Sequence, residues 1–251
     1  MHLKRIRLFA EQYPTREYYP FNLEIFQRTK TIDFVSPVTF FIGENGTGKS
    51  TLLEAVSRKC GIHIWQNDGG SRFQANPYEK DQYKFIAAEW SHDPVPGAFF
   101  SGELFRDFSR FLEEWAVKDP KMFDYFGGKS LVTQSHGQSL MSYFKARYKL
   151  RGLYLLDEPE TALSARSQLE LLNILKDMGR AKHAQFIIAT HSPILMACPQ
   201  AKILNFNETP IGEIEYRETE HYKIYKDFMA DPEKYLKETD NEIRPRVLSQ
   251  E

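Results

Sequence analysis

The sequence predicts an α/β protein whose core is one largely parallel β-sheet flanked by helices. Three apolar runs carry this prediction, because Val38–Ile42, Gly152–Glu160 and Ala184–Pro193 all contain unbroken hydrophobic stretches. Such stretches are typical of strands that are buried on both faces of a parallel sheet. Helical patterns lie between the runs, and strands that alternate with helices favour this architecture.

The N-terminal part is expected to add short strands. Leu3–Phe9 alternates between apolar and polar residues, which is typical of a strand with one buried face. An aromatic, proline-broken loop follows at Glu11–Asn22. Leu23–Gln27 and Thr31–Val35 are two further strand candidates, and Lys84–Trp90 is another.

Amphipathic patterns predict the helices. Apolar residues recur every three or four positions in Gly102–Val117, and the pattern in Thr161–Gly179 stops at a glycine, as helices often do. Helices are also expected at Lys49–Lys59 and at Ser139–Leu150. The charged segment Glu218–Glu238 is expected to be helical, with a fraying polar end after it.

Length and composition limit the class of protein. The chain has 251 residues, enough for one large domain, and its formal net charge of −1 gives no overall attraction to nucleic acid. The first residues are too charged for a signal peptide, and no apolar run approaches the length of a membrane span. Cys60 and Cys198 are expected to be reduced thiols. We therefore expect a soluble cytoplasmic protein without membrane insertion.

A glycine-rich loop follows the first apolar run. Gly43, Gly48, Lys49 and Ser50 match the phosphate-binding P-loop pattern G-x-x-x-x-G-K-[ST] (Walker A), between a strand and a helix. Glycines let backbone N–H groups surround an anion, and the helix N-terminus adds a positive dipole. The residues expected to bind ATP are Gly43, Glu44, Asn45, Gly46, Thr47, Gly48, Lys49, Ser50 and Thr51.

Two acids end the second apolar run. Asp157 and Glu158 follow a hydrophobic strand in a Walker B arrangement, and this strand is expected to run beside Val38–Ile42. Asp157 and Ser50 are expected to hold Mg²⁺. Glu158 is expected to be catalytic, because an acid there can orient or deprotonate the water that attacks the γ-phosphate. Without the P-loop, two solvated acids before a helix N-terminus would be an equally good interpretation.

A histidine and a short polar motif complete the set. His191 follows the third apolar run and is expected to be catalytic, because an imidazole there can contact the γ-phosphate and sense its presence. The motif "SHGQS" at Ser135–Ser139 opens a helix and can cap a phosphate. Taken alone, it is better explained as an ordinary capped helix.

In their order and spacing these motifs resemble the head of an ATP-binding cassette (ABC) ATPase, over about Val38 to Pro193. The segments "VTFFIGENGTGKSTLLEAV", "LLDEPETALS" and "IIATHSP" are similar to small soluble AAA-family ATPases, which are relatives of SMC-like and RecF-like ATPases. The resemblance implies a P-loop NTPase fold of the ABC-ATPase type. That fold includes an antiparallel N-terminal subsheet and a small helical lobe.

The resemblance also implies how ATP is used. In that superfamily two heads pack head to tail, and each ATP lies between the P-loop of one head and the signature of the other. Ser135, Gly137 and Gln138 would then contact the partner's ATP, and Ala162–Ser164 would face the same interface. We expect one domain over residues 1–251. Its expected parts are a helical signature lobe at about 97–150 and charged C-terminal helices with a tail at about 219–251.

Several positions differ from the transporter pattern. His136 replaces a glycine of the transporter signature, and Ser164 stands where transporters often carry aspartate. Glu89, Glu103 and Gln82 stay open for the role of the Q-loop glutamine. The residue that stacks on adenine is also open, and its aromatic candidates, which form a hydrophobic cluster in the other interpretation, are Tyr13, Tyr18, Tyr19 and Phe21.

The sequence therefore predicts a Mg²⁺-dependent ATPase whose ATP-gated homodimerisation acts on an unidentified protein or nucleic-acid partner. Two alternatives stay open. One is the ATP-binding subunit of a membrane transporter, and the other is a nucleotide-gated binding module in which hydrolysis is incidental. A basic cluster beside the signature helix suits nucleic acid, although a solvated helix face explains it more simply; it consists of Lys145, Arg147, Lys149 and Arg151.

Overall fold

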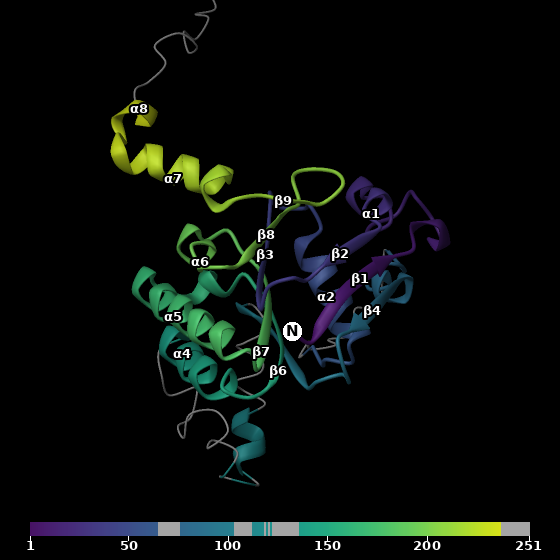
Figure 1. The fold of residues 1–251 in the computed structure, drawn as a ribbon, viewed down its shortest axis with the longest axis horizontal. Helices are drawn as coiled ribbons and strands as arrows, with labels where there is room; N and C mark the ends of the chain where they lie inside the picture. The colour runs from purple at the N-terminus through teal and green to yellow at the C-terminus, as the bar shows by residue number, and fades with distance from the viewer. Residues whose placement is uncertain (65–75, 103–111, 118, 120, 122–135, 237–251) are drawn as a thin grey trace, which may run out of the picture.

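A six-stranded sheet forms the centre of the protein in a computed structural model that describes residues 1–64, 76–102, 112–117, 119, 121 and 136–236 (Figure 1). Its strands lie in the order β5 (Gly97–Ser101), β6 (Gly152–Asp157), β7 (Ala184–Ala189), β3 (Val38–Ile42), β8 (Lys202–Asn205) and β9 (Gly212–Glu213). The first five are parallel, and β9 is antiparallel to β8. The prediction of a largely parallel sheet is confirmed.

The order of the strands corrects one expectation. The strand that carries Asp157 was expected to run beside Val38–Ile42, but β7 lies between them. Ile188 of β7 is in register with Phe40 on one side and with Leu156 on the other. All six residues of β7 are buried, so this strand gains most from a central position with a neighbour at each edge.

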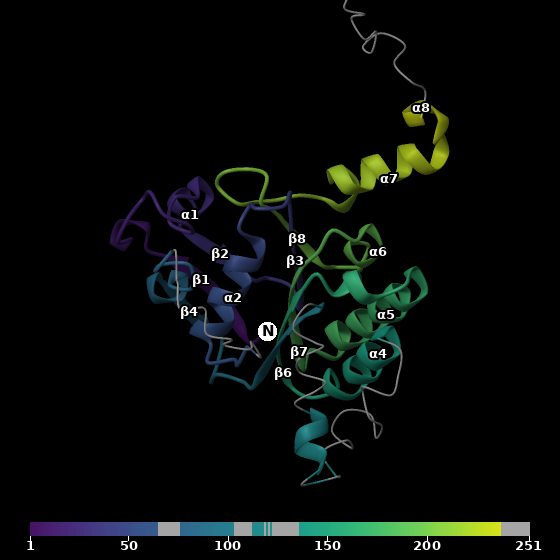
Figure 2. The same ribbon diagram turned by 180° about the vertical axis from the view of Figure 1, so that it is seen from behind.

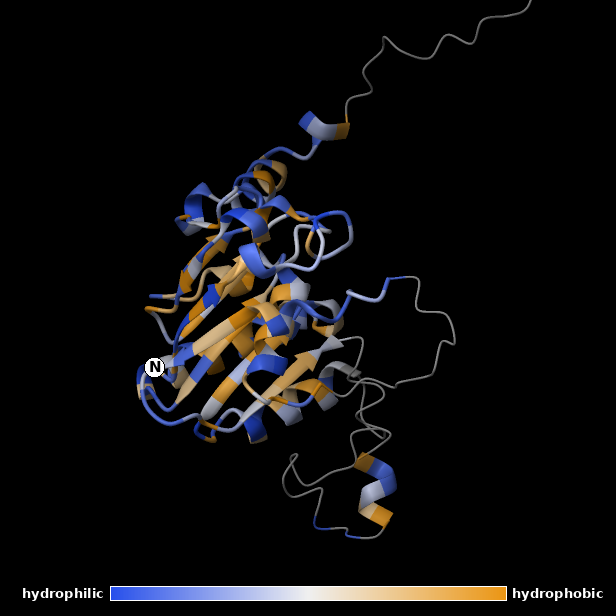
Figure 3. Ribbon diagram, turned by 90° about the vertical axis from the view of Figure 1, so that its right-hand side faces the viewer, coloured by the Kyte–Doolittle hydropathy of each residue, from blue (hydrophilic) through white to orange (hydrophobic). Residues whose placement is uncertain are grey.

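Alternate side chains of these strands fill two cores, because successive residues of a strand point to opposite faces. Phe40 and Leu156 belong to one core, whereas Phe41 and Leu155 belong to the other. The strands are accordingly hydrophobic along most of their length (Figure 3). The first core is covered by α4 (His136–Arg147), α5 (Ala165–Ala181) and α6 (Pro193–Met196), and the second by α2 (Lys49–Lys59) (Figures 1 and 2).

An antiparallel sheet packs against the second core. It has the order β2 (Thr31–Asp33), β1 (Leu3–Leu8) and β4 (Ile86–Trp90), so the expected antiparallel N-terminal subsheet is present. Gln185 of β7 joins the two sheets. Its Oε1 accepts hydrogen bonds from the backbone N–H groups of His2 and Leu3 at 2.8 Å each, and its Nε2 donates to the Leu3 carbonyl at 2.9 Å.

One predicted strand is wrong. Leu23–Gln27 was expected to be extended, but Glu24–Arg28 forms the short helix α1. Ile25 and Phe26 are neighbours in the chain and are both buried, which a strand with one buried face does not allow. Glu24 and Arg28 add an ion pair of 2.6 Å across one helical turn.

Other elements refine the expected boundaries. β5 places residues 97–101 in the main sheet, so they do not belong to the helical lobe expected from about residue 97. Of the helix expected at Gly102–Val117, the structure describes Gly102 and residues 112–117, all helical. The short 3-10 turns are η1 (Ala10–Gln12), η2 (Gln82–Phe85), η4 (Pro159–Ala162) and η5 (Tyr216–Glu218).

The C-terminal helices α7 (Glu220–Ala230) and α8 (Glu233–Leu236) project beyond α6 at one end of the molecule (Figure 1). Among the described residues, none of the helices is both long enough and apolar enough to cross a bilayer. Cys60 and Cys198 are both free thiols, and burial raises the pKa of each, to about 12 and about 11 respectively.

Candidate functional site

The loop between β3 and α2 needs its glycines. Gly43, Gly46 and Gly48 all have positive φ angles, at 145°, 81° and 96°, a region that favours glycine. Space gives a second reason. A Cβ atom at Gly48 would stand 2.7 Å from the Phe26 ring, and one at Gly43 would stand 2.8 Å from Asn207 Oδ1. The backbone path of the loop therefore requires glycine at Gly43 and Gly48.

The ammonium group of Lys49 lies against this loop. Lys49 is only 4% exposed, and its Nζ donates to the carbonyls of Gly43 at 2.7 Å and Glu44 at 2.8 Å. Burial lowers the pKa of Lys49, while Glu158 and Asp157 act in the opposite direction. The ammonium group is thus held at the mouth of the loop by the loop's own backbone.

Ser50, in the first turn of α2, connects the loop to the end of β6. Its hydroxyl donates to Asp157 Oδ1 at 2.9 Å, across 107 positions of the chain. Burial raises the pKa of Asp157 to about 7, the Ser50 hydrogen bond lowers it, and the nearby Glu158 raises it. No group of three or more His, Cys, Asp or Glu side chains suited to a metal occurs in the described residues. A hydroxyl and one carboxylate nevertheless suit Mg²⁺, which keeps several waters and binds phosphate oxygens.

Glu158 is held in an unusual backbone conformation. It adopts φ 45° and ψ 56°, a left-handed conformation that is uncommon outside glycine. Its N–H donates to the Ala189 carbonyl at 2.9 Å, and the hydroxyl of Thr161 donates to its carbonyl at 2.8 Å. Strain of this kind persists where the surrounding bonds fix it, often at functional sites.

His191, just beyond β7, faces the same edge. Its Nε2 stands 3.7 Å from Glu158 Oε1, and its backbone N–H donates to Glu160 Oε1 at 2.6 Å. Its Nδ1 stands 3.1 Å from Nε2 of His221. Burial, together with the charge of Lys49, lowers the pKa of His191, so the neutral imidazole is favoured at this place.

The signature motif lies partly outside the described residues, because Ser135 is not among them. Gly137 and Gln138 open α4, and a Cβ atom at Gly137 would stand 3.3 Å from the Ala162 carbonyl. Ser164 caps α5 by accepting a hydrogen bond from the Ser167 N–H at 3.3 Å. The structure therefore brings Gly137 next to the expected D-loop segment Ala162–Ser164.

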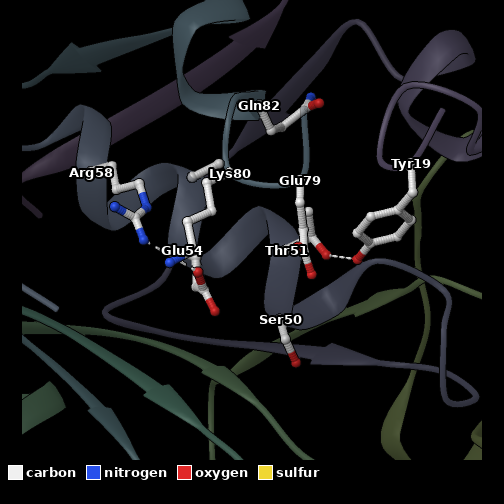
Figure 4. Close-up of a pocket in the computed structure, with 9 residues that line it drawn as sticks. Tyr19, Ser50, Thr51, Glu54, Arg58, Glu79, Lys80 and Gln82 are labelled. Atoms are coloured by element: carbon white, nitrogen blue, oxygen red, sulfur yellow. Dashed lines mark hydrogen bonds and ion pairs between the residues drawn. The ribbon is translucent and has the colours of Figure 1, made fainter. Parts of the chain in front are cut away.

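A cavity of about 240 Å³ adjoins the end of the loop, where Ser50, Thr51 and Tyr19 line it (Figure 4). Of the four aromatic candidates for adenine stacking, Tyr19 lines it, with its hydroxyl directed at the Thr51 hydroxyl. Phe21 is fully buried and packs on Tyr13 with ring centroids 4.6 Å apart, whereas Tyr18 is half exposed beside Tyr78. Tyr13 and Phe21 thus belong to a hydrophobic cluster.

The Q-loop candidates separate as well. Glu89 forms an ion pair with Arg7 in the antiparallel sheet. Gln82 is buried, and its amide donates to the Tyr13 hydroxyl at 2.9 Å. Glu103 lies outside the described residues. Its neighbour Gly102 follows β5 and lies beside Thr161, since a Cβ atom there would stand 2.5 Å from Thr161 Oγ1.

Sequence reasoning missed three residues of this edge: His221, Glu160 and Asn207. Asn207 follows β8, and its Oδ1 accepts from the Glu44 N–H at 2.7 Å. Burial raises the pKa of Glu160, and the hydrogen bond from the His191 N–H lowers it. Only Glu160 has a signal in the local sequence, because it lies two positions after Glu158 in the segment "DEPE". His221 and Asn207 reach the site from segments that the sequence gives no reason to place there.

Two segments of the chain match known families. Residues 21–70 match the family described as "AAA domain", and residues 139–197 match the family described as "AAA domain, putative AbiEii toxin, Type IV TA system". The first match contains the loop with Lys49 and Ser50. The second contains Asp157, Glu158 and His191.

Similar proteins are named as ATP-binding proteins of import systems. The chain is 25% identical over 182 residues to the petrobactin import ATP-binding protein FpuD of Bacillus anthracis, which covers 65% of each chain. It is 27% identical over 173 residues to the iron(3+)-hydroxamate import ATP-binding protein FhuC of Bacillus subtilis (strain 168), which covers 61% of this chain and 62% of the relative. The chain thus spans less than two thirds of either relative. Among solved structures, the SMC head domain from Thermotoga maritima has a TM-score of 0.47 at 15% identity and covers 86% of this chain and 100% of that chain.

Proposed function

We propose, from the premise that this chain is an ABC-type ATPase with AAA-family domains, that it binds ATP at residues 43–51 and hydrolyses it at the adjoining sheet edge. The hydrogen bond between Ser50 and Asp157 carries the proposal. A glycine loop before a helix accounts for phosphate binding alone. Its direct contact with the acid of a second strand adds the carboxylates that phosphoryl transfer requires.

The geometry of the loop and of the Ser50–Asp157 contact supports the following binding roles. Backbone N–H groups from Gly43 to Thr51 receive the phosphates, and Lys49 exchanges its bonds with the loop carbonyls for bonds with phosphate oxygens. Ser50 and Asp157 hold Mg²⁺, which neutralises phosphate charge when it is bound with ATP. To hold the metal, the Ser50 hydroxyl would have to leave its hydrogen bond with Asp157 while keeping its own proton, and Asp157 would have to be ionised. The cavity beside Thr51 and Tyr19 receives the nucleoside end.

The hydrolytic roles fall to Glu158 and His191. Glu158 accepts a proton from, or orients, the attacking water, and its bound backbone keeps the carboxylate at this edge. His191 stands beside it and stabilises the charge that develops on the terminal phosphate. The side chains as a whole are 38% and 31% exposed, but His191 Nε2 itself is buried, so its contact with the phosphate requires that this atom be uncovered when ATP binds.

ATP-gated dimerisation completes the proposal. Ser135, Gly137 and Gln138 of one copy contact ATP held by the loop of a second copy, and Ala162–Ser164 face the same interface. The close approach of Gly137 to the Ala162 carbonyl supports this, because the two segments expected at the interface are neighbours. In this scheme residues 1–251 act as one ATPase domain, with the lobe after Ser101 carrying the signature.

Glu158→Gln tests the proposal. Glutamine keeps the shape of the side chain but cannot accept a proton, so ATP binding should persist while turnover falls by about 100-fold or more. Because hydrolysis reopens such a dimer, the variant should stay closed on Mg-ATP. Light scattering should therefore show a doubled mass with Mg-ATP and no such change with ADP.

The matched control is Glu213→Gln. Glu213 lies on β9, and its exposed carboxylate is paired with Lys202 of β8. This variant should hydrolyse ATP like the wild type. Unchanged turnover in Glu158→Gln would remove Glu158 from the reaction. If the mass of the variant does not change when Mg-ATP is added, the gated dimer is contradicted. The hydrolytic site is then judged from turnover alone.

The names of the relatives favour one competing role, that of a transporter subunit. Fractionation of cells decides between the two. A soluble ATPase stays with the soluble fraction when it is expressed at its natural level, whereas a transporter subunit sediments with membranes in complex with a membrane-spanning protein.

A further inference from the structure

His221 approaches the site from the C-terminal helix. It lies in the first turn of α7, and its Nε2 stands 3.1 Å from Nδ1 of His191, with the two ring centroids 5.3 Å apart. Among the described residues, Nε2 of His191 and Nδ1 of His221 are both buried without a hydrogen-bond partner. The two imidazoles therefore share one hydrogen bond, and the free end of that pair points towards Glu158 at 3.7 Å.

The first turn of α7 is fixed while the rest of the helix is not enclosed. Thr219 is fully buried, and its hydroxyl caps the helix by accepting from the Tyr222 N–H at 3.2 Å. The Tyr216 hydroxyl donates at 3.0 Å to the carbonyl of Pro193, two positions after His191. Further along, Tyr225 and Met229 are 54% and 77% exposed. Within the described residues, α7 contacts η5 and the short helix α6, which begins two positions after His191 (Figure 1).

Proton counting separates two arrangements of the pair. A hydrogen bond between two imidazole nitrogens requires that one carry the proton and the other the lone pair. If His221 donates, His191 keeps its proton on Nε2 and directs an N–H at the carboxylate of Glu158. If His191 donates, its Nε2 lone pair faces that carboxylate instead. The first arrangement is electrostatically favoured.

The surroundings of the pair agree with neutral rings. Burial lowers the pKa of both histidines, and the charge of Lys49 lowers both further. The acids that act in the opposite direction are Glu158 and Glu44 for His191, and Glu44 and Glu220 for His221. With both rings neutral, the shared bond selects one tautomer of each ring.

We propose that His221 is a positioning residue, which donates from Nε2 to His191 Nδ1 and so fixes the Nε2–H tautomer of His191 towards Glu158 and the terminal phosphate of ATP. The role of the phosphate rests on the function proposed above. The choice of tautomer does not, because it is a property of the protein without nucleotide. The helix α7 thereby becomes a structural part of the hydrolytic edge.

The first test reads the tautomer directly. Protein labelled with ¹⁵N-histidine, without nucleotide and near pH 7.5, should show His191 with a protonated Nε2 and an unprotonated Nδ1, assigned by the loss of its signals in His191→Ala. His221→Leu should remove this preference. A protonated Nδ1 in the wild type would overturn the proposal, and so would an unchanged pattern in His221→Leu.

The second test uses a matched pair of variants. His221→Leu removes the donor, and kcat should fall about tenfold with KM within about twofold of the wild type. His221→Gln places an amide N–H₂ near the position of Nε2 and should recover kcat to within about threefold. Equal losses in the two variants would indicate a packing role only, as would a leucine variant with wild-type kcat.

A double variant closes the test. If His221 acts through His191, His191→Ala with His221→Leu should be no slower than His191→Ala alone. Additive losses would overturn the proposal. Should the wild type itself fail to hydrolyse ATP, the proposed function falls, and the tautomer of His191 still decides the role of His221.

Discussion

The two sides of the candidate site are built in different ways. On the loop side, the bonds of the Lys49 ammonium reach only five and six positions back along the chain, to Glu44 and Gly43. On the histidine side, His191 meets Glu160 and His221 across 31 and 30 positions. The position of the Lys49 ammonium thus depends on local backbone geometry, and that of His191 on how β6, β7 and α7 pack together.

On the loop side, we expect the largest loss of ATP binding from a substitution at Lys49. Lys49→Ala removes the ammonium group and little of the core, so we expect ATP affinity to fall by about 100-fold or more in a folded protein. Isothermal titration calorimetry measures the loss. Lys59→Ala, at the exposed end of the same helix, is the control and should bind ATP normally. Unchanged affinity in folded Lys49→Ala would refute the assignment of the loop.

Among the long-range contacts, those of Gln185 are expected to contribute measurably to stability. Gln185→Leu would leave the backbone groups of His2 and Leu3 buried without partners, and the free energy of unfolding should fall by about 2–4 kcal/mol. Urea unfolding followed by circular dichroism measures the change, with exposed Gln12→Leu as the control. ATP affinity should stay near that of the wild type, because the loop keeps its local bonds. A loss of stability below about 0.5 kcal/mol would show that Gln185 does not join the two sheets.

The two sides meet at the Ser50–Asp157 contact, and a pH series sharpens the comparison there. Burial raises the pKa of Asp157 from 3.8 to about 7. Between those values the native state holds a proton that the unfolded chain has lost, so this group makes the protein less stable as pH rises through the window. Without Mg²⁺ and nucleotide, Asp157→Asn should gain on the order of 2 kcal/mol over the wild type between about pH 4.5 and 7.5.

Urea unfolding at each pH supplies that measurement. Parallel stability curves for the wild type and Asp157→Asn would contradict a raised pKa for Asp157. The difference between the two proteins is the quantity to follow, because carboxylates that do not interact with Asp157 contribute equally to both curves.

Prediction from sequence succeeded where a structural element is encoded in consecutive residues. The strands at Val38–Ile42 and Ala184–Ala189, the glycine loop and the acids after Leu156 are all visible as short patterns. It failed at Leu23–Gln27, where two adjacent apolar side chains imitate a short strand but form a helical turn. It also gave no strand at Gly97–Ser101 or Lys202–Asn205, because "GAFFS" and "KILN" are too short to show a period.

The sequence by itself determined the local structure of the loop, because a strand followed within seven residues by three glycines and a lysine at the start of a helix allows few other backbone paths. Only the tertiary structure decided that β7 separates β6 from β3, that Gln185 holds the N-terminus, and that His221 meets His191. These contacts join residues 30 to 183 positions apart. Their formation depends on the order of strands and the docking of α7, which are set by burial summed over whole faces and leave no mark in any local pattern.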